Sequence, residues 1–380
     1  MACFTFHNGD DLSLVDRFLN QHRGQWVFGH ISYGLSQCLH GFQSSKTDPI
    51  GFPLLHFFVP AVCFQKAGAG VKMIVQDQKH DMDYWIRLFS TKEVEGPKIH
   101  KPVEQLRPRL SKNEYCTIVD RLRGHILRGD CYEINFCQEF YAHGAIIDPV
   151  RVYLDLEALS PNPFSCFYKH EEAYLLCASP ERFLAKRGNM LYSQPIKGTA
   201  LRQPGDEKAD EAAAHALQNS QKERSENVMV VDLVRNDLSR ICQKGSVKVD
   251  ELFGVYKYPQ VHQMISTVSG ALEPGVGMYE ILKATFPMGS MTGAPKLKVM
   301  ELIEKYEPTA RGIFSGSVGY IAPDGDFDFN VVIRSIFHNQ KSGYLGYQVG
   351  SGITWYSKAE DEYNECQWKA LAIRKALGTG

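Results

Sequence analysis

Residues 313–354 read IFSGSVGYIA, PDGD, FDFNVVIRSIFH, NQKSG and YLGYQVGSGIT in succession. The three longer runs are rich in aromatic and β-branched residues, which favour strands. The two short runs between them carry the Gly, Asp, Asn and Pro residues that favour turns. This part of the chain therefore predicts strands that arrive as neighbours, the pattern of an antiparallel sheet.

The rest of the chain repeats this grouping, with helices between groups of strands. FSCFY and AYLLCAS (164–168 and 173–179) predict a strand pair, and 131–142 and 261–272 are further strand-like runs. A capping box from Ser111 to Glu114 predicts a helix start, and Gly129 suits its end. The remaining predicted helices cover 206–219, 220–238, 296–307 and 357–377. The fold class that follows is α+β with large antiparallel sheets, not a Rossmann alternation.

The polar, proline-bearing stretch 91–110 predicts a connection between two parts of the chain. We expect residues 1–105 to form an N-terminal subdomain that contributes to the sheets, and residues 106–380 to form the core.

Bulk composition excludes several classes of protein. The 380 residues carry a formal net charge of −1 and no Lys/Arg block, so no nucleic-acid or anionic membrane partner is expected. The first residues lack the basic and apolar regions that predict a signal peptide, and no apolar run reaches membrane-spanning length. The ten cysteines are scattered without a CxxC pair, which suits buried thiols in a reducing compartment. We therefore expect a cytoplasmic protein.

Two acidic pairs on predicted helices could hold a cation. Glu223 and Glu226 lie three residues apart, Glu362 and Glu365 repeat that spacing, and Lys369 follows one turn later. The alternative is two solvated helix faces. If the faces meet, carboxylates without His or Cys favour Mg²⁺ over zinc, and an anionic substrate group would complete the site.

Four other polar residues occupy unusual places. Lys197 sits between Ile196 and Gly198 in a strand-like run, where the alternative is a solvated strand end. His262 and Arg334 lie in apolar strand-like runs, where a satisfied histidine and a structural salt bridge are the alternatives. Glu181 follows a strand and a proline, and turn chemistry could explain it. Glycine clusters at 286–296, 314–320 and 349–354 could cradle a carboxylate through backbone amides.

Nine blocks, taken in order, resemble the chorismate-binding enzymes, a family that includes anthranilate, isochorismate, salicylate and aminodeoxychorismate synthases. The blocks are SPERF, PIKGTALR, SENVMVVDLVRNDL, HQMISTVSG, FPMGSMTGAPK, RGIFSGSVGY, VVIRS, VGSGIT and EDEYNECQWKA. The resemblance covers roughly residues 100–380 and implies an anthranilate synthase-like four-layer αββα sandwich with chorismate in a cleft between two sheets. It makes residues 106–380 the chorismate-binding catalytic core.

The resemblance also implies roles for particular residues. Glu226 and Glu365 would bind Mg²⁺ directly, with Glu223 and Glu362 close behind. The predicted substrate-binding residues are Ser290, Phe314, Arg334, Gly350, Ser351, Gly352 and Lys369, and His262 would face the ring. Ser290 and Phe314 stand where many members have threonine and tyrosine.

The PIKGT block resembles the aminodeoxychorismate synthase branch, whereas anthranilate synthases carry alanine at the position of Lys197. The resemblance implies that Lys197 forms a covalent intermediate at ring C2, that ammonia then attacks C4, and that Glu181 is the general acid. A partly buried site near the cation should depress the pKa of Lys197. The product would be 4-amino-4-deoxychorismate, on the route to p-aminobenzoate and folate.

Ammonia has to be supplied, and no GxCxG-type glutaminase elbow is present. We therefore expect a separate glutamine amidotransferase subunit as partner. Two alternatives stay open within the family, an isochorismate synthase and an anthranilate synthase. A third belongs to another class: a catalytically silent chorismate-binding regulatory subunit.

Overall fold

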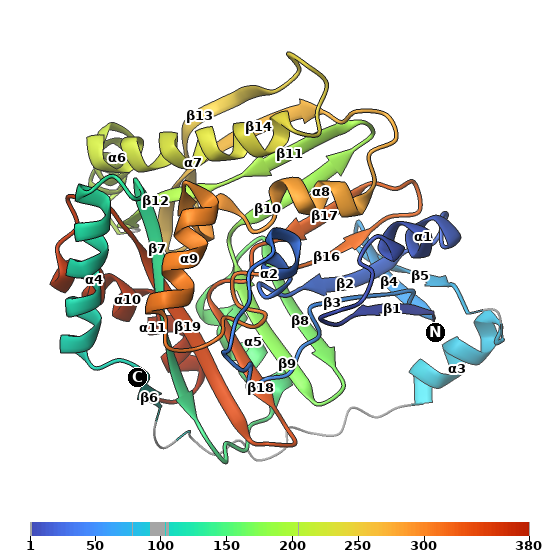
Figure 1. The fold of residues 1–380 in the computed structure, drawn as a ribbon. Coiled ribbons are helices and arrows are strands. Elements are labelled where there is room, and N and C mark those ends of the chain that lie inside the picture. The colour runs from blue at the N-terminus through green and yellow to red at the C-terminus, as the bar shows by residue number, and fades with distance from the viewer. Residues whose placement is uncertain (1, 78, 92–102, 104–105, 204, 380) are drawn as a thin grey trace.

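The computed structural model describes residues 2–77, 79–91, 103, 106–203 and 205–379. Within these residues, two large sheets and a small hairpin form the β structure, and every strand pair is antiparallel (Figure 1). In spatial order the larger sheet contains β1 (Cys3–Phe6), β3 (Leu55–Phe58), β2 (Val27–Ile31), β16 (Ser317–Ile321), β17 (Phe327–Asn330), β10 (Arg182–Arg187), β11 (Met190–Gln194), β14 (Val261–Ala271) and β12 (Ile196–Leu201), with β13 (Lys248–Lys257) also paired to β14.

The smaller sheet contains β15 (Gly293–Ala294), β7 (Glu133–Ala142), β19 (Tyr344–Ile353), β18 (Ser335–Asn339), β9 (Ala173–Ser179) and β8 (Phe164–His170), with β6 (Arg107–Pro108) also paired to β7. The hairpin is formed by β4 (Val62–Ala67) and β5 (Gly70–Val75). The helices of the described residues are α1 (Leu14–Gln21), α2 (Leu35–His40), α3 (Met82–Thr91), α4 (Lys112–Leu127), α5 (Pro149–Leu159), α6 (Glu207–Asn219), α7 (Gln221–Ser239), α8 (Met278–Thr285), α9 (Lys296–Tyr306), α10 (Ala359–Lys369) and α11 (Leu371–Ala376), with a short 3₁₀ helix η1 (Gly289–Met291).

Alternation along β9 shows how the layers are held together. Leu175 and Cys177 point into a core shared with the larger sheet and α7, whereas Leu176 and Ala178 point into a second core shared with α4, α5, α10 and α11. Figure 1 shows α6 and α7 along the larger sheet and α4, α10 and α11 beside the smaller one. The predicted α+β class with large antiparallel sheets is confirmed.

The run FDFNVVIRSIFH, predicted as one strand, is two strands in different sheets. It forms β17 in the larger sheet and β18 in the smaller one, and residues 331–334 carry the chain between them. Arg334 ends this crossover with a φ of 52°, a left-handed conformation that non-glycine residues rarely adopt. The prediction of a single strand is wrong because the crossover is as apolar as the strands it joins.

Local helix signals are confirmed. Ser111 and Glu114 form the capping box of α4, and Gly129 follows its end with a φ of 82°. The predicted helix 357–377 is interrupted at Ala370, so that α10 and α11 are separate. The predicted domain boundary between residues 105 and 106 falls at the edge of the residues that are not described, and it stays a prediction.

A histidine cluster lies where the first strands meet the β8–β9 hairpin. His30 accepts a hydrogen bond from Tyr168 OH at Nδ1 (2.9 Å) and donates from Nε2 to the carbonyl of Pro53 (2.9 Å). The rings of His56 and His170 lie 4.5 Å apart, centroid to centroid. Burial lowers the pKa of all three rings, that of His30 to about 3. The cluster is therefore neutral in the folded protein at neutral pH.

This cluster predicts loss of stability in acid. The pKa of His30 is lower in the folded than in the unfolded state, so its contribution is complete above pH 6.5 and is lost as the pH falls toward 3. Between pH 7.5 and 5 we expect His30 alone to lower the free energy of unfolding by about 2 kcal/mol. Denaturant unfolding at both pH values checks this, with His30→Gln as the comparison. An equal pH dependence in both proteins would contradict it.

Candidate active site

A cavity of about 460 Å³ lies between the two sheets, and it gathers most of the predicted site residues. Strand β12 of the larger sheet and β19 of the smaller one form parts of its wall, together with α7, α10, η1 and the crossover 331–334. The predicted residues that line it are Glu181, Lys197, Glu223, Glu226, Ser290, Phe314, Arg334, Gly350, Gly352, Glu365 and Lys369.

Lys197 points into the protein. Its side chain is 10% exposed, and Nζ donates a short hydrogen bond to Oε1 of Glu133 on β7. Gly198 has a φ of 93°, and a Cβ at this position would lie 3.0 Å from Oε2 of Glu223. The glycine after Lys197 is therefore required both by backbone conformation and by the close approach of α7. The alternative of a solvated lysine is excluded.

The charge state of Lys197 differs from the expectation. Burial acts to lower its pKa, but Glu133 and then Glu226 act in the opposite direction, and the net result is a raised pKa. The expected depression of this pKa assumed that a cation would dominate the surroundings, whereas the side chain faces several carboxylates. In this arrangement Lys197 is an ammonium ion.

Glu181 lies between β9 and β10, directly before β10, and is 4% exposed. Its backbone carbonyl accepts a hydrogen bond from the amide of Val331 (3.0 Å), which ties it to the crossover between the sheets. Burial raises the pKa of Glu181 to about 7. A carboxyl group with this pKa can donate a proton near neutral pH.

Glu223 and Glu226 project from α7 into the cavity, and Glu365 projects from α10. Ser220 caps α7, with its Oγ 3.4 Å from the amide of Glu223. Oε1 of Glu226 is buried without a hydrogen-bond partner, and burial raises the pKa of this carboxyl to about 7. Among the described residues, Lys222 forms an ion pair with this carboxyl, with Nζ 3.9 Å from that oxygen.

These carboxylates fit a hard cation in part. An unpartnered buried carboxylate oxygen is costly, and a cation beside it would remove that cost. Among the described residues, however, no group of three or more His, Cys, Asp and Glu side chains is arranged to hold a metal ion. The protein offers carboxylate oxygens from two helices, and Mg²⁺ commonly takes its remaining ligands from water and substrate.

Lys369 and Arg334 supply positive charge on the other walls. Nζ of Lys369 lies 2.7 Å from Glu365 and donates to the carbonyl of Gly350 (2.9 Å). No hydrogen bond or ion pair to the Arg334 guanidinium is found in the described part of the chain, so the predicted alternative of a structural salt bridge is not observed. An unpaired guanidinium in a cavity is suited to an anionic ligand.

Three predicted residues do not line the cavity. His262 is buried with Nε2 3.0 Å from Asp210, and the next residue, Gln263, faces the cavity instead. The structure thus corrects the position predicted for His262, because successive residues of a strand point to opposite faces. Ser351 places Oγ 3.3 Å from Tyr115 OH on α4, and Glu362 is buried outside the lining.

The sequence analysis missed Glu133, Gln263 and Lys222. Glu133 is a carboxylate inside the strand-like run CYEINFCQ, which could have marked it. Both polar atoms of the Gln263 side chain are buried without partners, which suits contact with a ligand. The sequence around Gln263 carries no comparable signal.

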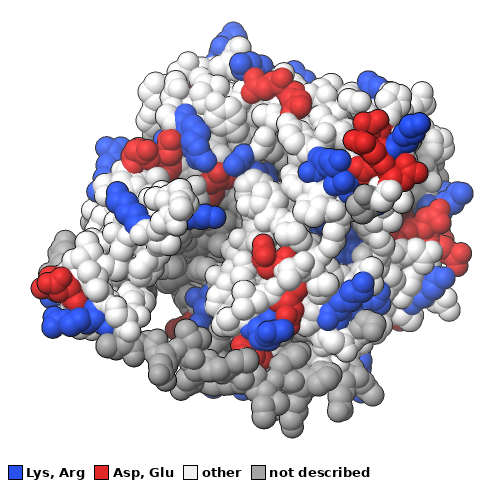
Figure 2. Space-filling view, turned by 180° about the vertical axis from the view of Figure 1, so that it is seen from behind, with Lys and Arg blue, Asp and Glu red and all other residues white. Residues whose placement is uncertain are grey.

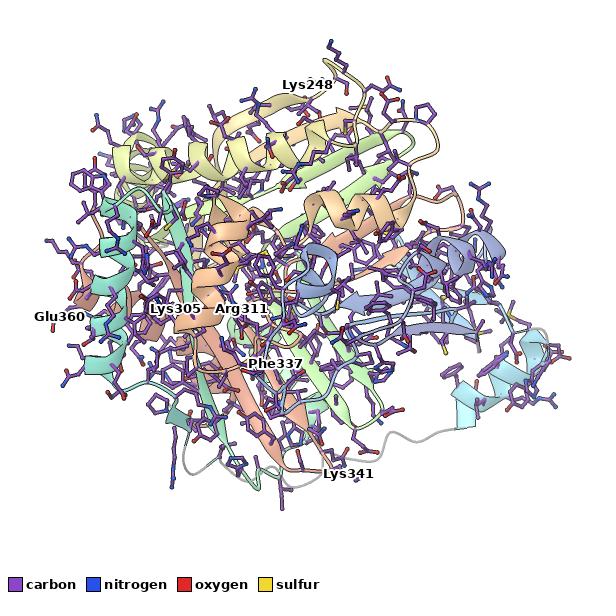
Figure 3. All side chains as sticks on the ribbon, in the orientation of Figure 1. Lys248, Lys305, Arg311, Phe337, Lys341 and Glu360 are labelled. Carbon is purple, nitrogen blue, oxygen red and sulfur yellow. The ribbon has the colours of Figure 1, made fainter. Side chains whose placement is uncertain are left out.

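Arg311 supports the cavity wall without lining the cavity itself. Its guanidinium donates to the carbonyl of Met291 (2.6 Å), next to Ser290, and to the carbonyl of Asn135 on β7 (2.9 Å). Glu307 balances the charge at 2.6 Å. Figure 3 labels Arg311 in the interior of the molecule, beside α9. The ion pair fixes the loop that carries Ser290 against β7.

The described residues on one face of the molecule carry no single dominant charge. On the face shown in Figure 2, Lys and Arg are interspersed with Asp and Glu. None of the helices in the described residues has the length and apolar character needed to cross a bilayer.

Comparison with known proteins gives consistent results. Residues 6–375 match the family described as chorismate binding enzyme. Component 1 of aminodeoxychorismate synthase from Escherichia coli is 35% identical over 80% of this chain and 68% of its own length. Component 1 of anthranilate synthase from Saccharolobus solfataricus is 33% identical over 93% of this chain and 80% of its own.

The fold agrees as well. The crystal structure of anthranilate synthase component I from Streptococcus pneumoniae superposes with a TM-score of 0.83 and 25% identity, covering 99% of this chain and 89% of that one. The predicted anthranilate synthase-like fold is confirmed. Component 1 of aminodeoxychorismate synthase from Bacillus subtilis is 36% identical over 70% of this chain, which spans 56% of that protein. A cavity between the two sheets with carboxylates on two helices, a match over nearly the whole length and a shared fold lead to one conclusion: the chain belongs to the family of chorismate binding enzymes.

Proposed function

We propose that this protein is the chorismate-aminating component of an aminodeoxychorismate synthase, which converts chorismate and ammonia to 4-amino-4-deoxychorismate. The observation that carries the proposal is the buried amine of Lys197 in a cavity with Glu181 and the carboxylates of α7 and α10. Two relatives named component 1 of aminodeoxychorismate synthase, 36% and 35% identical to this chain, support it. The similarity to an anthranilate synthase keeps that activity as the second candidate.

The chemistry proceeds in two displacements. The Lys197 amine adds to C2 while the two ring double bonds shift and the C4–O bond breaks. Glu181 protonates the departing hydroxyl, which leaves as water. Ammonia then adds to C4, the double bonds shift back, and the C2–N bond breaks to release Lys197. The ammonium group formed at C4 returns a proton to Glu181. Two displacements retain the configuration at C4.

Charge around the cavity would bind and orient the substrate. Arg334 and the backbone around Gly350 are suited to the enolpyruvyl carboxylate. Glu226, Glu365 and Glu223 would hold Mg²⁺, which when bound supplies positive charge for the ring carboxylate. Ser290, Phe314 and Gln263 line the space left for the ring.

The substrate ammonia would come from a glutamine amidotransferase subunit. The relatives are named component 1, which implies a second component. All ten cysteines are free of disulfides, which is consistent with a reducing compartment such as the cytoplasm.

Product analysis tests the proposal. The protein is incubated with chorismate, Mg²⁺ and ammonium, and products are identified by mass spectrometry; we expect 4-amino-4-deoxychorismate with pyruvate still attached. Formation of isochorismate without ammonium, or of fluorescent anthranilate, would assign one of the two rival activities. Stabilisation by chorismate without turnover would indicate a silent binding subunit.

The cation site predicts a stability effect that needs no turnover. In Glu226→Gln the buried carboxylate that lacks a partner becomes neutral, so the metal-free variant should be at least as stable as the wild type. Wild type should gain several degrees in melting temperature with millimolar Mg²⁺, and the variant should lose most of that gain. Thermal unfolding with and without Mg²⁺ measures both. Glu304→Gln, in α9 and outside this cavity, is the control and should respond like wild type. An undiminished Mg²⁺ response in Glu226→Gln would remove this glutamate from the site.

A further inference from the structure

The ion pair between Glu133 and Lys197 is placed between the two sheets. Glu133 comes from β7 of the smaller sheet and Lys197 from β12 of the larger one. The two side chains are 3% and 10% exposed, and Oε1 of Glu133 accepts the hydrogen bond from Nζ. Neither charge would be stable at this depth without the other.

Strand β19 closes over the pair. A Cβ on Gly352 would lie 2.8 Å from Oε1 of Glu133 and 2.8 Å from Nζ of Lys197. A side chain at this position would displace the ends of Glu133 and Lys197, so glycine lets the backbone lie against the ion pair. Because Nζ already donates to Oε1 of Glu133, a proton leaving Nζ has a direct path to that carboxylate.

The proposed reaction requires a neutral amine, whereas the resting site holds an ammonium ion. The carboxylates of α7 lie farther from Nζ of Lys197 than the Glu133 carboxylate does. Among the described residues, Nζ has a hydrogen bond to Glu133 and none to a carboxylate of α7. Glu181 has to carry a proton when the hydroxyl leaves, so it is unsuited to take one from Lys197. Glu133 is the carboxylate in direct contact with the reacting nitrogen.

We propose that Glu133 is a catalytic base of this protein, which takes the proton from Lys197 as the amine attacks and returns it when the amine is released; this rests on the proposed function. In the first step an N–H bond of Lys197 breaks, its electron pair stays on nitrogen, and an O–H bond forms on Glu133. In the last step Lys197 leaves C2 as a neutral amine and regains that proton. No external oxidant, reductant or further base is needed.

The test compares Glu133→Gln with wild type and with a matched control, Glu139→Gln. Glu139 lies six residues further along the same strand, is also buried, and pairs with Arg109 at 2.9 Å outside the cavity. The rate of 4-amino-4-deoxychorismate formation with saturating ammonium is measured from pH 6 to 8. Folding of each variant is checked by its melting temperature, and chorismate binding by its stabilising effect.

In Glu133→Gln we expect the rate at pH 7 to fall on the order of 100-fold or more, because a positioned base is lost. The amine then forms only by loss of a proton to solvent, so the ratio of wild-type to variant rate should fall as the pH rises, by about tenfold per pH unit at pH values where Lys197 of the variant is still an ammonium ion. Taking the ratio cancels any titration that both proteins share, including that of Glu181. The control should keep the wild-type rate and pH profile.

A Glu133→Gln variant that keeps the wild-type rate would overturn the proposal. A variant whose rate falls by the same factor at every pH would also overturn it, since that result indicates that Glu133 only positions Lys197. If Glu133→Gln does not fold, Glu133→Asp replaces it; a reduced rate with the wild-type pH profile supports a base at this position, and an unchanged rate contradicts it. Wild type that makes no aminodeoxychorismate would instead contradict the proposed function.

Discussion

Replacing Lys197 with alanine should abolish formation of 4-amino-4-deoxychorismate. The proposed chemistry needs a nitrogen that bonds to C2 and leaves again, and among the residues that the structure describes no other amine is in contact with Glu133. Loss of a covalent nucleophile commonly lowers a rate by several orders of magnitude, so we expect a decrease of at least about 1,000-fold. Product analysis by mass spectrometry with chorismate, Mg²⁺ and ammonium measures it.

The same substitution leaves the Glu133 carboxylate buried without its partner, which can cost about 3–5 kcal/mol of stability. A matched control separates the two effects. Lys296 is also buried and paired, with Nζ 2.6 Å from Asp237, but it lies outside the cavity. Lys296→Met should lose stability and retain the product, whereas folded Lys197→Ala should lack the product. Wild-type turnover by the Lys197→Ala protein would remove lysine from the mechanism.

Features set by neighbouring residues could be predicted from the sequence. The capping box of α4 depends on Ser111 and Glu114, which are close in the chain, and Gly129 is the residue that a helix end favours. Glu223 and Glu226 are three residues apart on α7, and this spacing alone places them on one face of the helix. Such signals need no knowledge of the tertiary structure.

Features set by distant residues could not be predicted in this way. The partner of Lys197 lies 64 residues earlier, on a strand of the other sheet. A partner of this kind raises the pKa of a lysine that burial alone would lower. The charge state of the nucleophile therefore depends on how the two sheets are packed, and local sequence does not contain that information.

The errors along strands have a simpler origin. In β14 a shift of one residue exchanges the two faces, so His262 and Gln263 were equally consistent with a strand that has one side toward a ligand. The structure places the histidine against Asp210 and the glutamine in the cavity. In the crossover 331–334, Val331, Val332 and Ile333 are apolar like the strand before them, so no polar residue indicates the end of that strand before Arg334.

Glu181→Gln should lower the rate by about 100- to 10,000-fold, the range that a general acid contributes. Glutamine has nearly the same shape, but it cannot protonate the hydroxyl that leaves C4. Because the pKa of Glu181 is raised to about 7, the wild-type rate should fall as the pH rises above 7, and this decrease should be absent from the residual rate of the variant. The pH dependence of product formation measures both effects.

The substitution Glu181→Gln should lower the rate but raise the stability of the protein above pH 7. The pKa of Glu181 is higher in the folded than in the unfolded state, so its stabilising contribution is complete below about pH 4.5 and is lost as the pH rises through about 7. Above pH 7 the wild type has to bury an ionised carboxylate, which glutamine avoids, so Glu181→Gln should unfold at a higher temperature there. A variant that is slower and also less stable at pH 8 would indicate a structural role for Glu181 in place of acid catalysis. A loss of rate together with a gain in stability is what a carboxyl group kept protonated for catalysis requires, because the same burial that raises its pKa opposes folding once the proton has left.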